Sequence, residues 1–345
     1  MRNSNFELLR IFAIWGIVLH HLVINGIYVC GYNTDFDGEK YNGGGYIGII
    51  INSFTVYGVN LFILISGWFG IKSNYKIIIW LIVDTAFFGL IALFIASYFS
   101  PYKFNVHNIL STISITKYWF ILHYIILMLV APIIERVLFN IDEKTLRRYL
   151  IILTIVNIFF GWILQTVNTN GLNYNNFIYI YIIGRYLKVL QNTNNEIYNK
   201  ISKYALNIFI MTIISEVILY IITDIMGHHP KSLRFWGYNS PWVIISSMCV
   251  FIYFSKKNIQ SKTINLIAKG VLGAYLIHTN SFITPTRNQI AIEIFERYNY
   301  LGILSYSLCI TIVCIFLSLI YILLKDQLLR SLKKINLIAF INAIP

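Results

Sequence analysis

Residues 301–324 read LGILSYSLCITIVCIFLSLIYILL and contain no charged side chain. An α-helix rises 1.5 Å per residue, so about 20 apolar residues cross the roughly 30 Å hydrocarbon core of a bilayer. This segment can therefore span a membrane as one helix. The whole chain has the same character, because 57% of its 345 residues are hydrophobic and 12% are charged. Soluble domains carry about 25% charged residues, so the composition excludes an ordinary water-soluble protein.

Further apolar segments recur between 301–324 and the N-terminus. The full set predicts about ten transmembrane helices, at residues 8–29, 46–69, 77–98, 117–138, 149–166, 176–190, 204–223, 241–255, 264–283 and 301–324. We find no internal repeat and no soluble region between the segments. The sequence therefore predicts an all-α integral membrane bundle that forms a single domain over 1–345, with a core of about 5–325 and a cytoplasmic tail at 326–345.

The basic residues are divided unevenly between the two sides of this predicted bundle. With the N-terminus in the cytoplasm, 18 lysines and arginines fall at inner positions and 7, including Arg287, at outer positions. Lysine and arginine collect on the cytoplasmic loops of membrane proteins. We therefore expect both termini in the cytoplasm and a multi-pass protein of the cell membrane, of the bacterial plasma-membrane type. The net charge of +13 then reflects topology rather than nucleic-acid binding.

Several ionisable side chains fall inside the predicted spans, where a charge costs about 3 kcal/mol or more. They are Arg10, His20, His21, Asp84, His123, Arg185, Glu216 and His278. Eleven residues at 100° each place Arg10 and His21 on one helix face, about 16 Å apart along the axis. Arginine suits phosphate, and histidine can accept a proton near neutral pH. Alternatively, Arg10 pairs with Glu7 one turn earlier and His21 is a buried packing residue.

The other ionisable residues have weaker interpretations. His20 lies 100° around the helix from His21 and belongs to another face. Arg185 and Glu216 are expected to pair inside the bundle, whereas Asp84 has no evident partner in the sequence. The four cysteines have no CxxC spacing, so neither a metal site nor a disulfide framework is predicted.

Four blocks of the sequence carry a family resemblance. They are RIFAIWGIVLHH at 10–21, YGVNLFILISGWFGI at 57–71, KYWFILHYIILMLVAP at 117–132 and LGAYLIHTN at 272–280. In this order they resemble the integral membrane acyltransferases called acyltransferase family 3, and they bracket roughly residues 5–325. Many relatives carry an Arg-x-x-Arg motif after the second helix, where this chain reads GIKSNYK. Some relatives also carry an extracytoplasmic hydrolase-like domain, which we do not expect here.

The resemblance implies an activity that the composition does not show. Family members move an acyl group, usually acetyl, from acyl-CoA to an acceptor, commonly a hydroxyl of a cell-surface polysaccharide or its lipid-linked precursor. By this resemblance, His21 and Arg10 form the catalytic pair, and His21 removes the proton of the acceptor hydroxyl. Direct transfer and a covalent acyl relay both remain open. No bound cofactor is expected, and acetyl-CoA is a substrate.

The resemblance also proposes the binding residues. Those for the substrate are Ser66, Tyr118, Trp119, Tyr275 and His278, and those for the coenzyme are Arg10, Lys72 and Lys76. Structural alternatives stand beside them, because Ser66-Gly67 permits close helix packing and Tyr118 and Trp119 fit an interfacial aromatic belt.

The principal alternative function is a polytopic transporter or flippase of a glycan precursor, since buried charges fit that class too. Transporters often show paired repeats and matching broken helices, and the sequence shows neither. A membrane polysaccharide polymerase would need an acidic cluster, which the sequence also lacks.

Overall fold

The computed structural model describes residues 3–27, 45–72, 74–99 and 103–334, and these residues form helices and connections without a strand. The helices are α1 Ser4–His21, α2 Gly45–Ser53, α3 Gly58–Phe69, α4 Tyr75–Phe99, α5 Val106–Ile113, α6 Trp119–Phe139, α7 Glu143–Val156, α8 Tyr174–Asn192, α9 Glu196–Ile225, α10 His229–Ser232, α11 Pro241–Ser255, α12 Lys262–Ile267, α13 Val271–His278 and α14 Thr284–Lys334. The predicted all-α class is confirmed.

Seven helical stretches in the described residues are long and apolar enough to cross a membrane. They are Ser4–Gly26, Gly45–Phe69, Tyr75–Tyr98, Trp119–Phe139, Glu143–Ile163, Glu196–Ile225 and Thr284–Ser331. The other three predicted spans fall on α8, on α11 and on the α12–α13 pair, which are helical but shorter or less apolar. The protein is therefore a multi-pass membrane protein, and the count of ten spans stays a prediction.

Several predicted spans are interrupted. A π-helix at Leu22–Gly26 continues α1, and a turn separates α2 from α3 inside the predicted span 46–69. Asn299 has a left-handed backbone with φ of 52°, which kinks α14 just before the apolar segment 301–324. Arg287, which the sequence analysis counted among the outer basic residues, lies within α14 before this kink and is buried.

Helix starts are set by short polar side chains. Each accepts a hydrogen bond from a backbone N–H in the first turn of its helix, which satisfies one of the four orphan donors there. These residues are Asn105, Asp142, Asn173, Asn195 and Ser261. The caps fix where α5, α7, α8, α9 and α12 begin after their connections.

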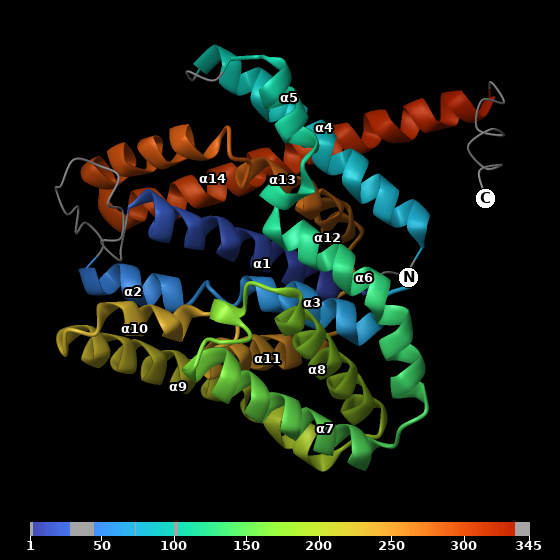
Figure 1. Cartoon of the computed structure of the whole chain (residues 1–345), viewed down its shortest axis with the longest axis vertical. Coiled ribbons are helices and arrows are strands. Elements are labelled where there is room, and N and C mark those ends of the chain that lie inside the picture. The colour runs from blue at the N-terminus through green and yellow to red at the C-terminus, as the bar shows by residue number, and fades with distance from the viewer. Residues whose placement is uncertain (1–2, 28–44, 73, 100–102, 335–345) are drawn as a thin grey trace.

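Helix α1 occupies the centre of the bundle. It lies between α14 and α3 in Figure 1, and it also packs on α11 and α13. The face of α1 that carries Leu9, Ala13 and Ile17 is buried in the main hydrophobic core. Helix α1 begins on the same side of the molecule on which α14 ends (Figure 1). This central position brings the ionisable residues of α1 against several other helices.

Helices α3 and α8 cross at a pair of glycines. A β-carbon added to Gly184 would lie 2.5 Å from the carbonyl oxygen of Leu64 and 3.1 Å from the α-carbon of Gly67. Real β-carbons do not approach that closely, so only glycine fits at this crossing. Small residues permit such close approach between membrane helices. The crossing holds the end of α3 in place, and Ser66 lies beside it.

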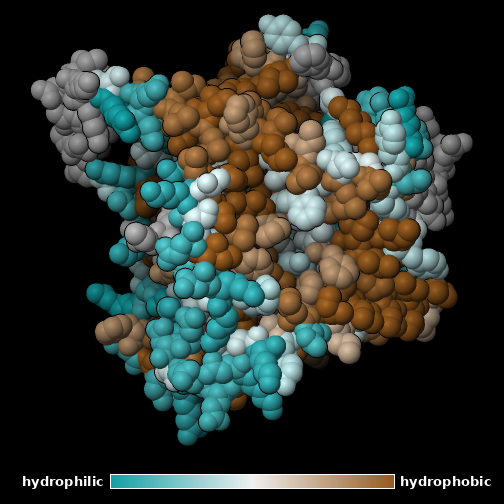
Figure 2. Space-filling view, turned by 180° about the vertical axis from the view of Figure 1, so that it is seen from behind, coloured by the Kyte–Doolittle hydropathy of each residue, from teal (hydrophilic) through white to brown (hydrophobic). Residues whose placement is uncertain are grey.

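The outer surface of the helices is largely apolar. Figure 2 shows hydrophobic side chains over much of one face, with hydrophilic side chains gathered toward a lower corner. Large apolar residues such as Ile133, Met211 and Phe316 are each more than 60% exposed on long helices. In water such a surface would drive aggregation, whereas lipid accommodates it.

Candidate active site

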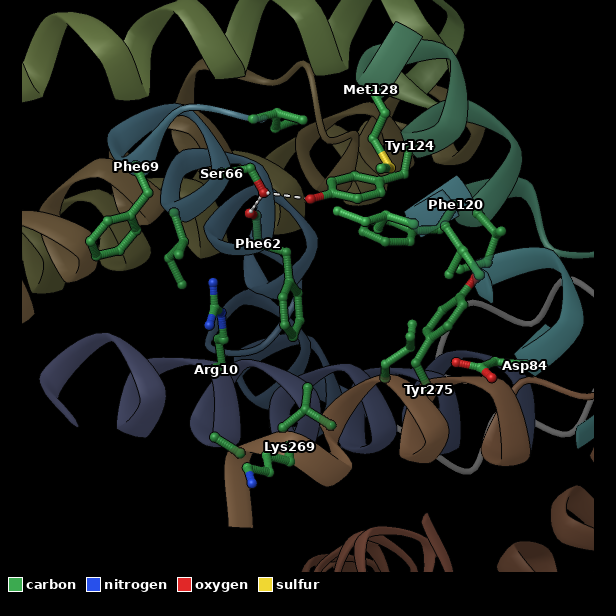
Figure 3. Close-up of a pocket in the computed structure, with 18 of the residues that line it drawn as sticks. Arg10, Phe62, Ser66, Phe69, Asp84, Phe120, Tyr124, Met128, Lys269 and Tyr275 are labelled. Atoms are coloured by element: carbon green, nitrogen blue, oxygen red, sulfur yellow. Dashed lines mark hydrogen bonds between the residues drawn. The ribbon is translucent and has the colours of Figure 1, made fainter. Parts of the chain in front are cut away.

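A cavity of about 530 Å³ lies between α1, α3, α4, α6 and α13. Figure 3 shows its lining, with Arg10 and Lys269 toward one end and Phe120, Tyr124 and Tyr275 around the interior. Apolar and aromatic side chains form most of the wall, and a few polar groups project into it. A mostly apolar cavity with few convergent polar groups is the usual form of a small-molecule site.

Charged side chains gather at one end of this cavity. Arg10 pairs with Glu7 at 2.8 Å, so the ion pair that the sequence allowed as an alternative is present. The Arg10 side chain is 31% exposed and lines the cavity, although it is paired with Glu7. Lys72, just after α3, and Lys269, in the turn before α13, add two exposed ammonium groups. This end of the cavity can bind an anionic group.

The wall between the charged end and the interior carries a hydroxyl pair. Ser66 Oγ donates to the carbonyl oxygen of Phe62 at 2.9 Å and lies 3.0 Å from the Tyr124 hydroxyl, as Figure 3 shows. The Tyr124 ring stacks on Phe120 at 5.7 Å between centroids. Ser66 thus lines the cavity as predicted, and it is tied to α6 through Tyr124.

Asp84 of α4 lines the same cavity and does have partners. Lys325 pairs with its carboxylate, and the Tyr321 hydroxyl donates to the same oxygen at 2.6 Å. Both partners lie near the end of α14, so their contact with α4 could not be read from nearby sequence. The Lys325 ammonium also lies 4.2 Å from the centre of the Trp80 ring, another part of the cavity wall.

A histidine pair lies beyond the inner end of the cavity. Ile17 and Tyr275 belong to the cavity wall. One turn further along α1, the His21 ring lies 5.3 Å from the His278 ring, which in turn lies 6.0 Å from the Tyr275 ring. His278 is buried, whereas His21 keeps part of its surface exposed. The structure therefore brings Tyr275, His278 and His21 together, and Arg10 lies along α1 toward the charged end.

His20 faces a different neighbour. Its Nδ1 lies 2.6 Å from the Oδ1 of Asn52 on α2, which makes a hydrogen bond. The ring centres of His20 and His21 are 5.5 Å apart. Of the two adjacent histidines, His21 is the one whose ring packs against His278, with the ring planes tilted by 32°.

Comparison of the sequence with known protein families identifies the family of this chain. A family model described as an acyltransferase domain, that of acyltransferase family 3, matches residues 3–324. The chain belongs to this family. No curated protein and no solved structure matches it significantly. The chain is thus a multi-pass membrane acyltransferase, as the sequence resemblance indicated.

The remaining predicted site residues of the acyltransferase lie outside the cavity lining. Tyr118 is buried behind the wall, where Asn280 donates to its hydroxyl at 2.6 Å and its ring lies 6.4 Å from Tyr275. Trp119 stacks on Tyr238 at 5.6 Å. Lys76 is exposed on the first turn of α4. Tyr118 and Trp119 both approach the lining, because the Trp119 ring lies 6.2 Å from the ring of Phe120, which lines the cavity.

The expected pair between Arg185 and Glu216 does not form in the acyltransferase. Arg185 instead pairs with Glu135 of α6 at 2.9 Å. Glu216 of α9 is fully buried, and neither carboxylate oxygen has a hydrogen-bond partner among the described residues. The sequence could not settle this pairing, because buried charges on different helices pair by tertiary packing rather than by spacing.

Two charged residues of this acyltransferase site were missed by sequence analysis. Lys269 was counted only as an inner basic residue, although it lines the cavity. Arg287 was counted only as an outer basic residue, although it is 5% exposed and donates to the backbone oxygen of His278 at 2.6 Å. The sequence signal that could have indicated its place near the histidine pair was its position, since Arg287 follows His278 by only nine residues.

Proposed function

We propose that this membrane acyltransferase moves an acyl group, acetyl by family analogy, from acyl-CoA to a hydroxyl of a cell-surface polysaccharide or its lipid-linked precursor. The observation that carries the proposal is the cavity, which is cationic at one end and adjoins the His21–His278 pair at the other. Acyl-CoA has matching chemistry, with phosphates at one end and a reactive thioester at the other.

The cavity suits the acyl donor along its length. Arg10, Lys72 and Lys269 would hold the phosphates through charge-assisted hydrogen bonds. The apolar wall would accept the slender arm that leads to the thioester. Along α1, eleven residues separate Arg10 from His21, which is about 16 Å. In this arrangement the thioester reaches the histidine pair while the phosphates stay at the charged end.

The chemistry follows from the position of His21. His21 would take the proton of the acceptor hydroxyl as the hydroxyl oxygen attacks the thioester carbonyl carbon. The carbon–sulfur bond then breaks, an ester forms, and the proton passes to the departing coenzyme thiolate. We further propose that the charged end of the cavity faces the cytoplasm, where acyl-CoA is found, and that both termini lie on that side of the plasma membrane.

The function is tested by the surface glycan itself. Cells that produce the protein should carry an alkali-labile ester on a surface polysaccharide, and cells without the gene should lack it. The measurement is nuclear magnetic resonance of purified glycan before and after mild base treatment. Identical glycans from both cells would rule out this class of acceptor.

The coenzyme site is tested by removing two of its charges. Replacing both Lys72 and Lys269 with alanine should raise the KM for acetyl-CoA roughly tenfold, because two exposed charge contacts together contribute about 1.4 kcal/mol. The effect should shrink in high salt, which screens exposed charges. A control variant with alanine at Lys144 and Arg148, which are exposed on α7 away from the cavity, should keep its KM. Equal KM changes in both variants would argue against this position for the phosphates.

A further inference from the structure

Arg287 of α14 is a buried cation beside the histidine pair. Its side chain is 5% exposed. One terminal nitrogen donates to the backbone oxygen of His278 at 2.6 Å, and the Nε and the other terminal nitrogen donate to the Oδ1 of Asn288 at 3.1 and 2.7 Å. Arginine carries five N–H donors. Within the described chain these are its three hydrogen bonds, so two N–H groups remain for a further acceptor.

Among the residues that the structure describes, the charge of Arg287 has no counter-ion. Its partners are a carbonyl oxygen and an amide oxygen, both neutral, and no carboxylate of the described residues forms an ion pair with it. Arginine does not lose its proton in proteins. Burying an unpaired charge is unfavourable, and a negative charge nearby would offset that cost.

The neighbours of Arg287 are held in a fixed arrangement. His278 Nδ1 lies 2.8 Å from the carbonyl oxygen of Ala274, and because a carbonyl only accepts, Nδ1 must carry the proton. The backbone oxygen of His278 accepts from Arg287, while its ring packs against His21 with the ring centres 5.3 Å apart. His21 and the guanidinium of Arg287 are thus joined through one residue. Such fixed placement is what electrostatic stabilisation of a transition state requires.

We propose that Arg287 stabilises the oxyanion that forms during acyl transfer, an inference that rests on the proposed function. When the acceptor oxygen bonds to the thioester carbon and its proton moves to His21, the carbonyl oxygen gains a full negative charge. The two remaining N–H groups of Arg287 then have an acceptor, and the buried charge gains its counter-ion. When the carbon–sulfur bond breaks, the carbonyl re-forms and the charge leaves with the thiolate. The same oxyanion occurs whether transfer is direct or passes through an acyl-enzyme.

The inference is tested with full-length protein in lipid nanodiscs and acetyl-CoA as the probe. Release of coenzyme thiol is measured with water as the only acyl acceptor, and the ester content of surface glycan is measured in cells. Arg287→Gln should lower kcat of thiol release by about 100- to 1,000-fold, as loss of an oxyanion partner does, with the KM for acetyl-CoA unchanged. The glycan ester should fall with it. Arg297→Gln, an exposed arginine of the same helix, should behave as wild type.

A second variant covers the case in which Arg287→Gln fails to fold. Arg287→Lys keeps the charge but replaces the planar guanidinium with one ammonium group. This variant should lose kcat while eluting as a single peak in size-exclusion chromatography.

Loss of glycan ester with normal thiol release would assign Arg287 to the acceptor and overturn the inference. An increase in KM alone would overturn it as well. If wild-type protein releases no thiol and forms no ester, the proposed function itself fails, whereas an active wild type with an equally active Arg287→Gln refutes only the role of Arg287.

Discussion

His21→Ala should abolish acyl transfer while the protein remains folded in the membrane. A general base contributes about a hundredfold to ten-thousandfold to the rate, and His21 is the partly exposed member of the histidine pair. The loss should appear in kcat for release of coenzyme thiol from acetyl-CoA and in the ester content of surface glycan. The KM for acetyl-CoA should change little, because in the proposed arrangement the phosphates bind at the other end of the cavity.

His20→Ala is the matched control on the same helix. His20 is engaged by Asn52 and does not contact His278 in the described structure, so the variant should retain most of the activity. The opposite result, an inactive His20 variant with an active His21 variant, would show that the reaction occurs on the other face of α1. Two active variants would remove both histidines from the mechanism.

Gly184→Ala should cause a large loss of stability. The added carbon would lie 2.5 Å from the Leu64 carbonyl oxygen, and backbone atoms cannot yield without separating α3 from α8. Overpacking a tight core costs about 1–3 kcal/mol and occasionally more. Thermal unfolding in detergent, followed by size-exclusion fluorescence, should show a lower Tm and a smaller monodisperse peak.

Gly16→Ala is the comparison for that variant. A β-carbon at Gly16 would meet its nearest atom, the Thr55 carbonyl oxygen, at 3.5 Å, which is ordinary van der Waals contact. Its Tm should stay level or rise, because alanine favours a helix over glycine by about 1 kcal/mol. Equal Tm values for both variants would mean that the α3–α8 crossing relaxes more easily than its geometry suggests.

The sequence predicted the helices better than their interruptions. Each predicted span falls on a helical stretch because apolar length alone identifies a segment that suits lipid. The break between α2 and α3 lies in residues 54–57, where the composition barely changes. The part of α14 before Asn299 was missed for the opposite reason, since residues 284–298 are too polar to read as a span.

The candidate site was predictable where its residues lie on one helix or in one sequence block. Spacing placed Arg10 and His21 on one side of α1, and the blocks containing Ser66 and Tyr275 line the same cavity. Lys325 lies 241 positions from its partner Asp84, so spacing could not suggest that pair. The burial of Arg287 likewise depends on how α14 folds back against α13, which is a tertiary contact.

The π-helix at Leu22–Gly26 divides the first span into two parts whose helical registers are independent of each other. Up to His21 the helix has α-helical register, and that register sets the angle between His21 and Arg10. After His21 the wider turn resets the register, and Gly26 packs closely against Ala291 of α14. Insertions and deletions therefore change the orientation of His21 relative to Arg10 on one side of this boundary and not on the other. A one-residue deletion between Arg10 and His21 rotates His21 by about 100° relative to Arg10, whereas one within Leu22–Gly26 restores an ordinary α-helix and leaves His21 aligned with Arg10.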